Sequence, residues 1–140
     1  MSKNIRLYKD LPDDSNTFYI DVKGAVTGVR YRGEFKSKIP SVKTHLEIDK
    51  HRAFLCGDMV EYLQPSTIIM YKQIAYLRFT LTDYAEFWEQ SDLGADLKDA
   101  NVIEEVYNQV LEFEEKWLKE AYPDRDGKDE DESEGNEAEA

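Results

Sequence analysis

The sequence of 140 residues contains a single cysteine and no long apolar run. Cys56 has no second cysteine with which to form an internal disulfide or a thiolate metal site, so disulfide-scaffold and zinc-finger chemistry are excluded. The apolar stretches are a few residues long, far short of the roughly 20 residues that span a bilayer. The start of the chain also lacks the apolar run of a signal peptide. We therefore expect a cytoplasmic protein with no membrane partner.

Basic residues are scarce relative to acidic ones, since 18 Lys and Arg stand against 30 Asp and Glu and give a net charge of -12. Binding to nucleic acid through phosphate charge needs clustered Lys and Arg, so we expect no nucleic-acid partner. From Pro123 to Ala140, nine acids face two basic residues, and no large apolar side chain is present. Residues 123–140 are therefore predicted to form a disordered acidic tail. Such a tail can keep the domain soluble or shield a basic site on a partner.

Residues 17–122 are predicted to form a single α+β domain, after a flexible, turn-rich arm over residues 1–16. Apolar and polar residues alternate over residues 17–23 and again over residues 29–36, which predicts two half-buried strands. A glycine-bounded connection, Gly24 to Gly28, joins them, so we expect a β-hairpin. An isolated hairpin is marginally stable in water, and the rest of the chain or a partner must therefore cover its apolar face.

The first of about three expected helices begins after the capping residue Ser41 and ends at about Cys56, where Gly57 can stop it. One stripe of this helix is expected to face the core, although an acid interrupts it. The stripe consists of Val42, Leu46, Asp49, Ala53 and Cys56. Cys56 is accordingly expected to be a small buried residue.

The second helix begins at Pro65 and is expected to be the most buried one, although residues 77–82 also alternate like a strand. The connection over residues 83–99 contains aromatic residues, which we expect to pack back on the domain. The third helix begins after its capping residue Asp99 and ends before Pro123. Its apolar stripe consists of Val102, Val106, Val110, Phe113 and Trp117.

No constellation of catalytic or metal-binding residues is evident in the sequence. His45 and His51 are separated by about 120° around a helix, so they cannot share a metal on one face. Each can instead pair with an acid one turn away, His45 with Asp49 and His51 with Glu47. The acids of residues 124–129 lack the following helix that a calcium loop needs. We expect no enzymatic activity, no cofactor and no metal, because no nucleophile, base and orienting group can be named together.

Three segments follow one another in an order that is informative. They are Phe18-x-Ile20-x-Val22-Lys23-Gly24-x-Val26-Thr27-Gly28-x-x-Tyr31-x-Gly33-x-Phe35, then Ala85-Glu86-Phe87-Trp88, then Asp99-x-Asn101-Val102. In these segments the chain resembles the small tail assembly chaperones of long-tailed bacteriophages, in which a glycine-rich hairpin, a proline-and-tryptophan segment and an Asp-x-Asn-Val helix opening recur. The resemblance covers roughly residues 17–118. It departs from the family in the second segment, where a proline and two tryptophans are expected.

The resemblance implies a non-enzymatic protein of the host cytoplasm that binds the tape-measure protein, helps to recruit tail-tube subunits and leaves before the tail is complete. The chain is also a possible homo-oligomer, and a frameshifted longer form occurs in many of these phages. A small acidic domain with apolar stripes can mask the long amphipathic helices of a tape-measure protein. The candidate partner-binding residues are Tyr19, Tyr31, Phe87 and Trp88. Two alternatives stay open, namely a structural virion component, such as a tail or head-tail accessory protein, and an acidic inhibitor of a host nucleic-acid enzyme.

Overall fold

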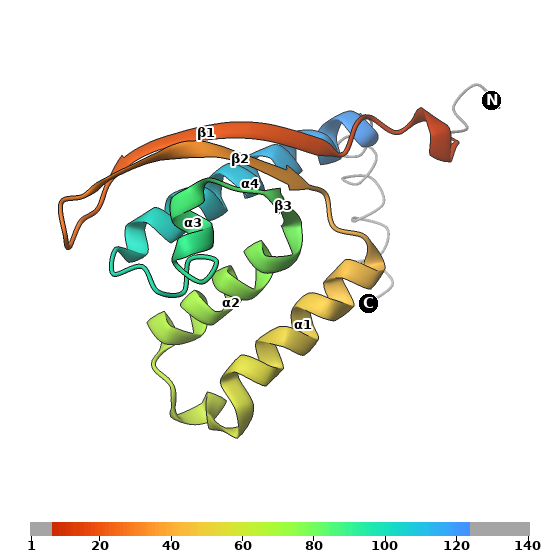
Figure 1. Ribbon diagram of the computed structural model, residues 1–140. Coiled ribbons are helices and arrows are strands. Elements are labelled where there is room, and N and C mark those ends of the chain that lie inside the picture. Colours follow the sequence, from red (N-terminus) through yellow and green to blue (C-terminus); the bar gives the residue numbers. More distant parts are fainter. Residues whose placement is uncertain (1–6, 124–140) are drawn as a thin grey trace, which may run out of the picture.

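The computed structural model describes residues 7–123. The acidic segment 124–140 lies outside these residues, as does the first part of the predicted arm. The predicted disorder of this segment and the comparison of residues 124–129 with a calcium loop therefore fall outside the described residues. The fold is α+β, with a sheet near the N-terminus followed by helices (Figure 1). A short 3-10 helix, η2 (Tyr8–Asp10), precedes the sheet.

The sheet has three antiparallel strands in the order β1-β2-β3. β1 (Ser15–Lys23) and β2 (Arg30–Lys38) form the predicted hairpin, which begins two residues before its expected start. β3 (Leu81–Asp83) pairs with β2 and was not predicted. The alternation of residues 77–82 becomes a strand only at Leu81, because the preceding residues belong to a helix that packs on the core.

The two faces of the hairpin have different environments. On the inward face, Phe18, Ile20 and Phe35 are buried beneath the helices. The residues of the opposite face, which we call the outward face, are all exposed. They are Ser15, Thr17, Tyr19, Asp21 and Lys23 on β1 and Arg30, Arg32, Glu34, Lys36 and Lys38 on β2.

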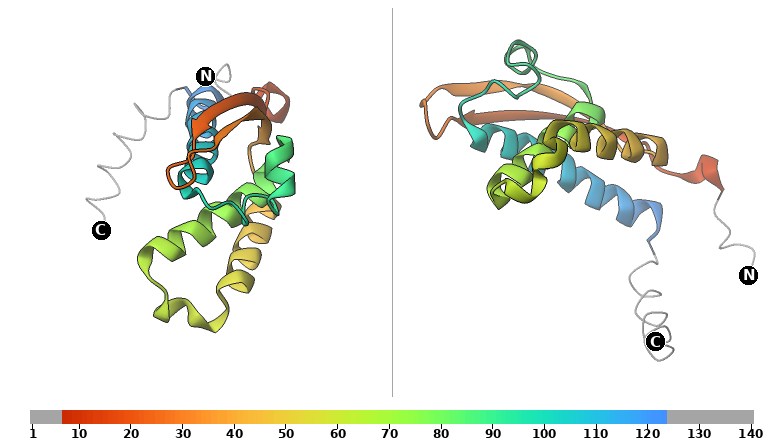
Figure 2. Two further views of the ribbon diagram at one scale, coloured as in Figure 1. Left: turned by 60° about the vertical axis from the view of Figure 1, so that its left-hand side comes forward. Right: turned by 90° about the horizontal axis from the view of Figure 1, so that it is seen from below.

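The three long helices occur where they were expected. They are α1 (Val42–Cys56), α2 (Pro65–Thr80) and α4 (Ala100–Ala121). Ser41 caps α1, because its Oγ accepts a hydrogen bond from the Thr44 amide at 3.2 Å. A 3-10 helix, η3 (Gly57–Tyr62), connects α1 to α2, and a short helix, α3 (Glu86–Gln90), lies within the predicted connection. Figures 1 and 2 show α2 and α4 next to the sheet and α1 farther from it.

The predicted core stripe of α1 is wrong, because the helix packs on α2 through its other side. Ile48 is buried and Leu55 is partly buried, whereas Val42 and Leu46 are 79% and 65% exposed. Since α1 has apolar residues on both sides, periodicity alone does not identify the packed one. We call the exposed side the outer face of α1. It consists of Val42, Leu46, Asp49 and Ala53.

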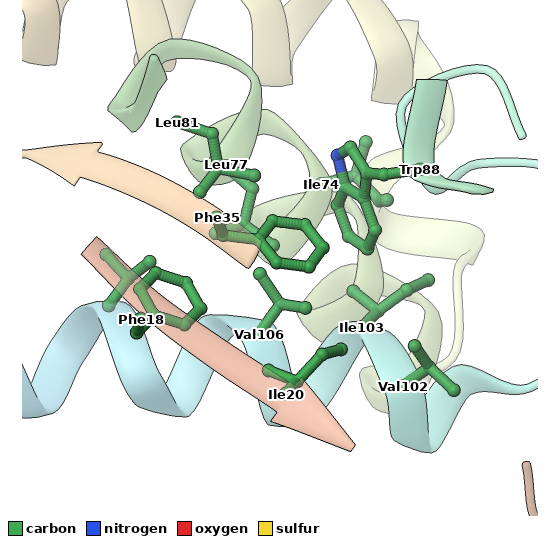
Figure 3. Packing of buried hydrophobic residues seen from close by; sticks show 11 residues of the cluster. Phe18, Ile20, Phe35, Ile74, Leu77, Leu81, Trp88, Val102, Ile103 and Val106 are labelled. Carbon is green, nitrogen blue, oxygen red and sulfur yellow. The ribbon is translucent and has the colours of Figure 1, made fainter. Parts of the chain in front are cut away.

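The core lies between the inward face of the hairpin and the helices, as Figure 3 shows for the most buried side chains. Trp88 of α3 is 1% exposed, and its ring packs edge-on against Phe35 with the centroids 5.6 Å apart. The aromatic residues of the connection therefore pack on the domain, as predicted. The stripe of α4 is also confirmed, with Val102, Val106 and Val110 buried. In α2 the second half is buried, whereas the first half carries exposed apolar side chains.

Three smaller expectations need correction. Cys56 is only partly buried, because it lies at the end of α1 on the side that faces away from α2. Neither predicted histidine pair forms an ion pair within residues 7–123. His51 instead packs edge-on against Phe79, with ring centroids 5.6 Å apart, and burial lowers its pKa.

Among the helices of this part of the chain, none is both long and apolar enough to cross a membrane.

Candidate functional site

The β1-β2 loop is held by Asp99, a residue more than seventy positions away in the sequence. Asp99 is fully buried, and its Oδ1 accepts hydrogen bonds from the amides of Val26 at 2.6 Å and Thr27 at 2.9 Å. Its Oδ2 accepts from the Thr27 hydroxyl at 2.6 Å and from the Tyr31 hydroxyl at 3.0 Å. Asp99 occupies the N-cap position of α4 but makes no side-chain capping bond, so its predicted capping role is wrong. The carboxylate joins the loop to the helix instead.

Asn101 completes this attachment from the first turn of α4. Its Oδ1 accepts a hydrogen bond from the Ala25 amide, and its Nδ2 donates to the carbonyl of Lys23, both at 2.9 Å. At the other end of α4, Trp117 Nε1 donates to the carbonyl of Pro12 at 3.2 Å. Side chains of α4 are therefore bonded near both ends of β1, and the helix runs along this edge strand (Figure 1).

The environment of Asp99 favours its ionised form. The hydrogen bonds from Thr27, together with those from Val26 and Tyr31, lower the pKa of Asp99 to about 2, although burial acts in the opposite direction. Four donors occupy both carboxylate oxygens. The group is therefore an acceptor with a structural role, and the geometry does not suit it to proton transfer.

The four predicted partner-binding residues do not form one surface. Trp88 is buried in the core, so in this structure it offers no surface to a partner. Tyr31 and Phe87 are partly buried neighbours, with ring centroids 5.1 Å apart. Tyr19 is 60% exposed and lies on the outward face of the hairpin, on the other side of the sheet. Of the four residues, Tyr19 is therefore the one best placed to contact a partner.

An exposed apolar surface that was not predicted lies on α1 and η3. The outer face of α1 contributes Val42 and Leu46, and both point away from the packed side of the helix. Further large apolar side chains are exposed near the end of α1 and in η3. They are Phe54, Met59 and Tyr62. Exposed large apolar side chains of this kind are candidates for contact with a partner.

A groove of about 440 Å³ lies between α2, residues 92–98 and the start of α4. Its lining is mainly apolar and includes Met70, Ile74 and Ile103. Arg78 lies at its edge, with its Nη2 3.9 Å from Asp92 Oδ1. A groove of this volume can accept apolar side chains of another molecule, because such sites occupy about 300–1,000 Å³.

A partly buried acid links α2 to α4. The hydroxyl of Tyr76 donates a hydrogen bond to the carboxylate of Glu114, and the ring of Tyr76 packs edge-on against Tyr107. Burial raises the pKa of Glu114 more than the hydrogen bond lowers it, and burial also raises the pKa of both tyrosines. The ring of His45 is also near Tyr76, with ring centroids 6.4 Å apart. The cluster therefore connects the two helices.

Within residues 7–123, no three His, Cys, Asp or Glu side chains are placed to hold a metal ion. Scans against protein-family models, curated proteins and solved structures found no significant match to this chain.

Proposed function

We propose that the chain is a tail assembly chaperone of a long-tailed bacteriophage that binds the tape-measure protein and helps to recruit tail-tube subunits. The observation that carries the proposal is the outer face of α1, where Val42 and Leu46 are exposed and are covered by nothing else in residues 7–123. The resemblance supplies the partner, since a tape-measure protein has long amphipathic helices that aggregate when they are exposed. An apolar helix face on a small acidic domain can cover such a stripe during assembly.

Two of the segments on which the resemblance is based lie together in the structure. Residues 23–28 and Asp99-x-Asn101 are joined by hydrogen bonds that Asp99 accepts and by hydrogen bonds that Asn101 both accepts and donates. Their shared role is to attach the hairpin to α4. Partner binding is then left to other surfaces, first of all the outer face of α1.

The test is co-expression of the full chain with the tape-measure protein encoded beside it, followed by measurement of soluble and co-purified tape-measure protein. Leu46→Asp places a charge on the outer face of α1 and should reduce the co-purified amount about tenfold. Leu118→Asp is the matched control, because Leu118 is also exposed, at 40%, but lies on α4. Both variants should keep the melting temperature of the unchanged chain, since both positions are on the surface.

The outcomes separate the possible functions. If the unchanged chain neither solubilises nor retains the tape-measure protein, the proposal is wrong. Detection of the chain in purified virions would favour a structural virion component. If both variants retain the partner equally well, the interaction uses another surface than the outer face of α1.

A further inference from the structure

The outward face of the hairpin is basic although the chain as a whole is acidic. Five of its ten exposed residues are Lys or Arg and two are acids, a net charge of +3 in a chain of -12. Asp21 pairs with Arg30 and Arg32, with N···O distances of 2.7 and 3.3 Å. Lys36 and Lys38 take part in none of the ion pairs formed within residues 7–123. On the neighbouring strand β3, Asp83 is exposed and lies opposite Lys36. With Asp83 included, the outward face of the sheet still has a net charge of +2.

The end of α4 lies beside the start of β1, at the edge of the sheet. Ser15 lies opposite Lys38, and the carbonyl of Pro12 accepts the hydrogen bond from Trp117 near the end of α4. Figure 1 shows the end of α4 next to the start of β1. Since β1 is an edge strand, a segment that continues from α4 needs to pass around only one strand to reach the outward face.

The continuing segment has the complementary charge. Residues 124–140 contain nine acids and two basic residues, a net charge of -7. Fully extended, this segment can reach about 55 Å, whereas a nine-residue strand is about 30 Å long. Its length therefore allows it to cover the whole outward face. Because it is tethered, its effective concentration at the face is on the order of millimolar, so a weak charge interaction is sufficient.

We propose that the acidic segment 124–140 binds the outward face of the β-hairpin and shields it. Tyr19 lies at the centre of this face, so the segment also covers the most exposed of the predicted partner-binding residues. An external partner must then displace the segment, which favours partners that are themselves acidic. This inference is independent of the proposed function, because it concerns two parts of one chain.

The experiment uses the full-length chain with a single spin label. Cys56 is the only cysteine, so Cys56→Ser combined with Ser133→Cys provides one site for a nitroxide within the acidic segment. At low salt, the amide NMR signals of Tyr19 and Glu34 should lose intensity, whereas those of Leu46 and Ala53 on α1 should keep it. At about 1 M NaCl the lost intensity should return, because the Debye length falls to about 3 Å.

Two charge-reversal variants identify the binding face. Lys36→Glu with Lys38→Glu should restore the signals of the hairpin at low salt. The matched control, Lys43→Glu with Lys50→Glu, reverses two exposed charges on α1 and should leave the loss unchanged. All four positions are exposed, so both variants should fold. If one does not, the salt dependence of the signals in the chain with native lysines decides whether the acidic segment binds the outward face.

Three results would overturn the proposal. In the first, the hairpin signals keep their intensity at low salt. In the second, the Lys36→Glu and Lys38→Glu variant shows the same loss of intensity as the chain with native lysines. In the third, the loss arises only between spin-labelled and isotope-enriched chains in a mixture, which would place the acidic segment of a second copy on the face.

Discussion

Gly24 lies so close to Asp99 that a β-carbon at residue 24 would stand 2.3 Å from the Asp99 carboxyl carbon. The loop can approach the carboxylate only because residue 24 has no side chain. This glycine is thus required by a close approach, whereas Gly28 is required by its positive φ of 76°. The two glycines that bound the loop have different physical roles.

The different roles predict different responses to substitution. Gly24→Ala should lower the free energy of unfolding by about 2–3 kcal/mol, because the loop or Asp99 must move to make room. Gly28→Asn should change it by less than about 1 kcal/mol, since asparagine tolerates a left-handed conformation and the space around Gly28 is open. Urea unfolding followed by circular dichroism measures both values. Equal losses would contradict the close approach of Gly24 to Asp99.

The buried carboxylate predicts a loss of stability in acid. The folded-state pKa of Asp99, about 2, lies below its ordinary value of 3.8, so the unfolded chain binds the proton first as the pH falls. The contribution of Asp99 is therefore complete above about pH 4 and is lost as the pH falls through about 2. Melting temperatures measured over this range should fall less steeply for Asp99→Asn than for the unchanged chain. Asp96→Asn, at an exposed position, is the control and should keep the original slope.

Glu114 predicts the opposite dependence at higher pH. Its folded-state pKa is raised above 4.5, so its contribution to stability is complete below that value and is lost as the pH rises through the folded-state pKa. Glu114→Gln keeps an acceptor for Tyr76 and removes the titrating group. The variant should be at least as stable as the unchanged chain at neutral pH, and less dependent on pH above 4.5. Glu112→Gln, at an exposed position, is the control. A marked loss of stability in Glu114→Gln but not in Glu112→Gln would contradict the prediction and show that the charge of Glu114 stabilises the fold.

The parts of the fold that the sequence predicts well are those with one apolar face. The hairpin and α4 each have a clear period, and both were found where that period places them. α1 has apolar residues on two sides, so its packed side depends on the position of α2, which a local pattern does not contain. α3 has only five residues, too few for a helical period to appear. An aspartate before a helix favours a simple cap, which is why the sequence predicts one at Asp99. The contact of Asp99 with the hairpin loop could not be predicted in this way, because its partners are distant in sequence.

The positions of Trp88 and Tyr19 predict that only one of these aromatic residues contributes to partner binding. Trp88→Ala should lower the free energy of unfolding by about 3–5 kcal/mol, because it empties the space beside Phe35. Tyr19→Ala should change it by no more than about 0.5 kcal/mol, since Tyr19 projects from the outward face. Chemical denaturation measures both values, and co-purification with the tape-measure protein compares partner binding by the two folded variants. Trp88→Phe keeps an aromatic ring in the core and replaces Trp88→Ala in the binding assay, so that the variant compared with Tyr19→Ala is folded. If Trp88→Phe reduces the co-purified partner while Tyr19→Ala does not, Tyr19 lies outside the contact surface and Trp88 becomes accessible when the partner binds.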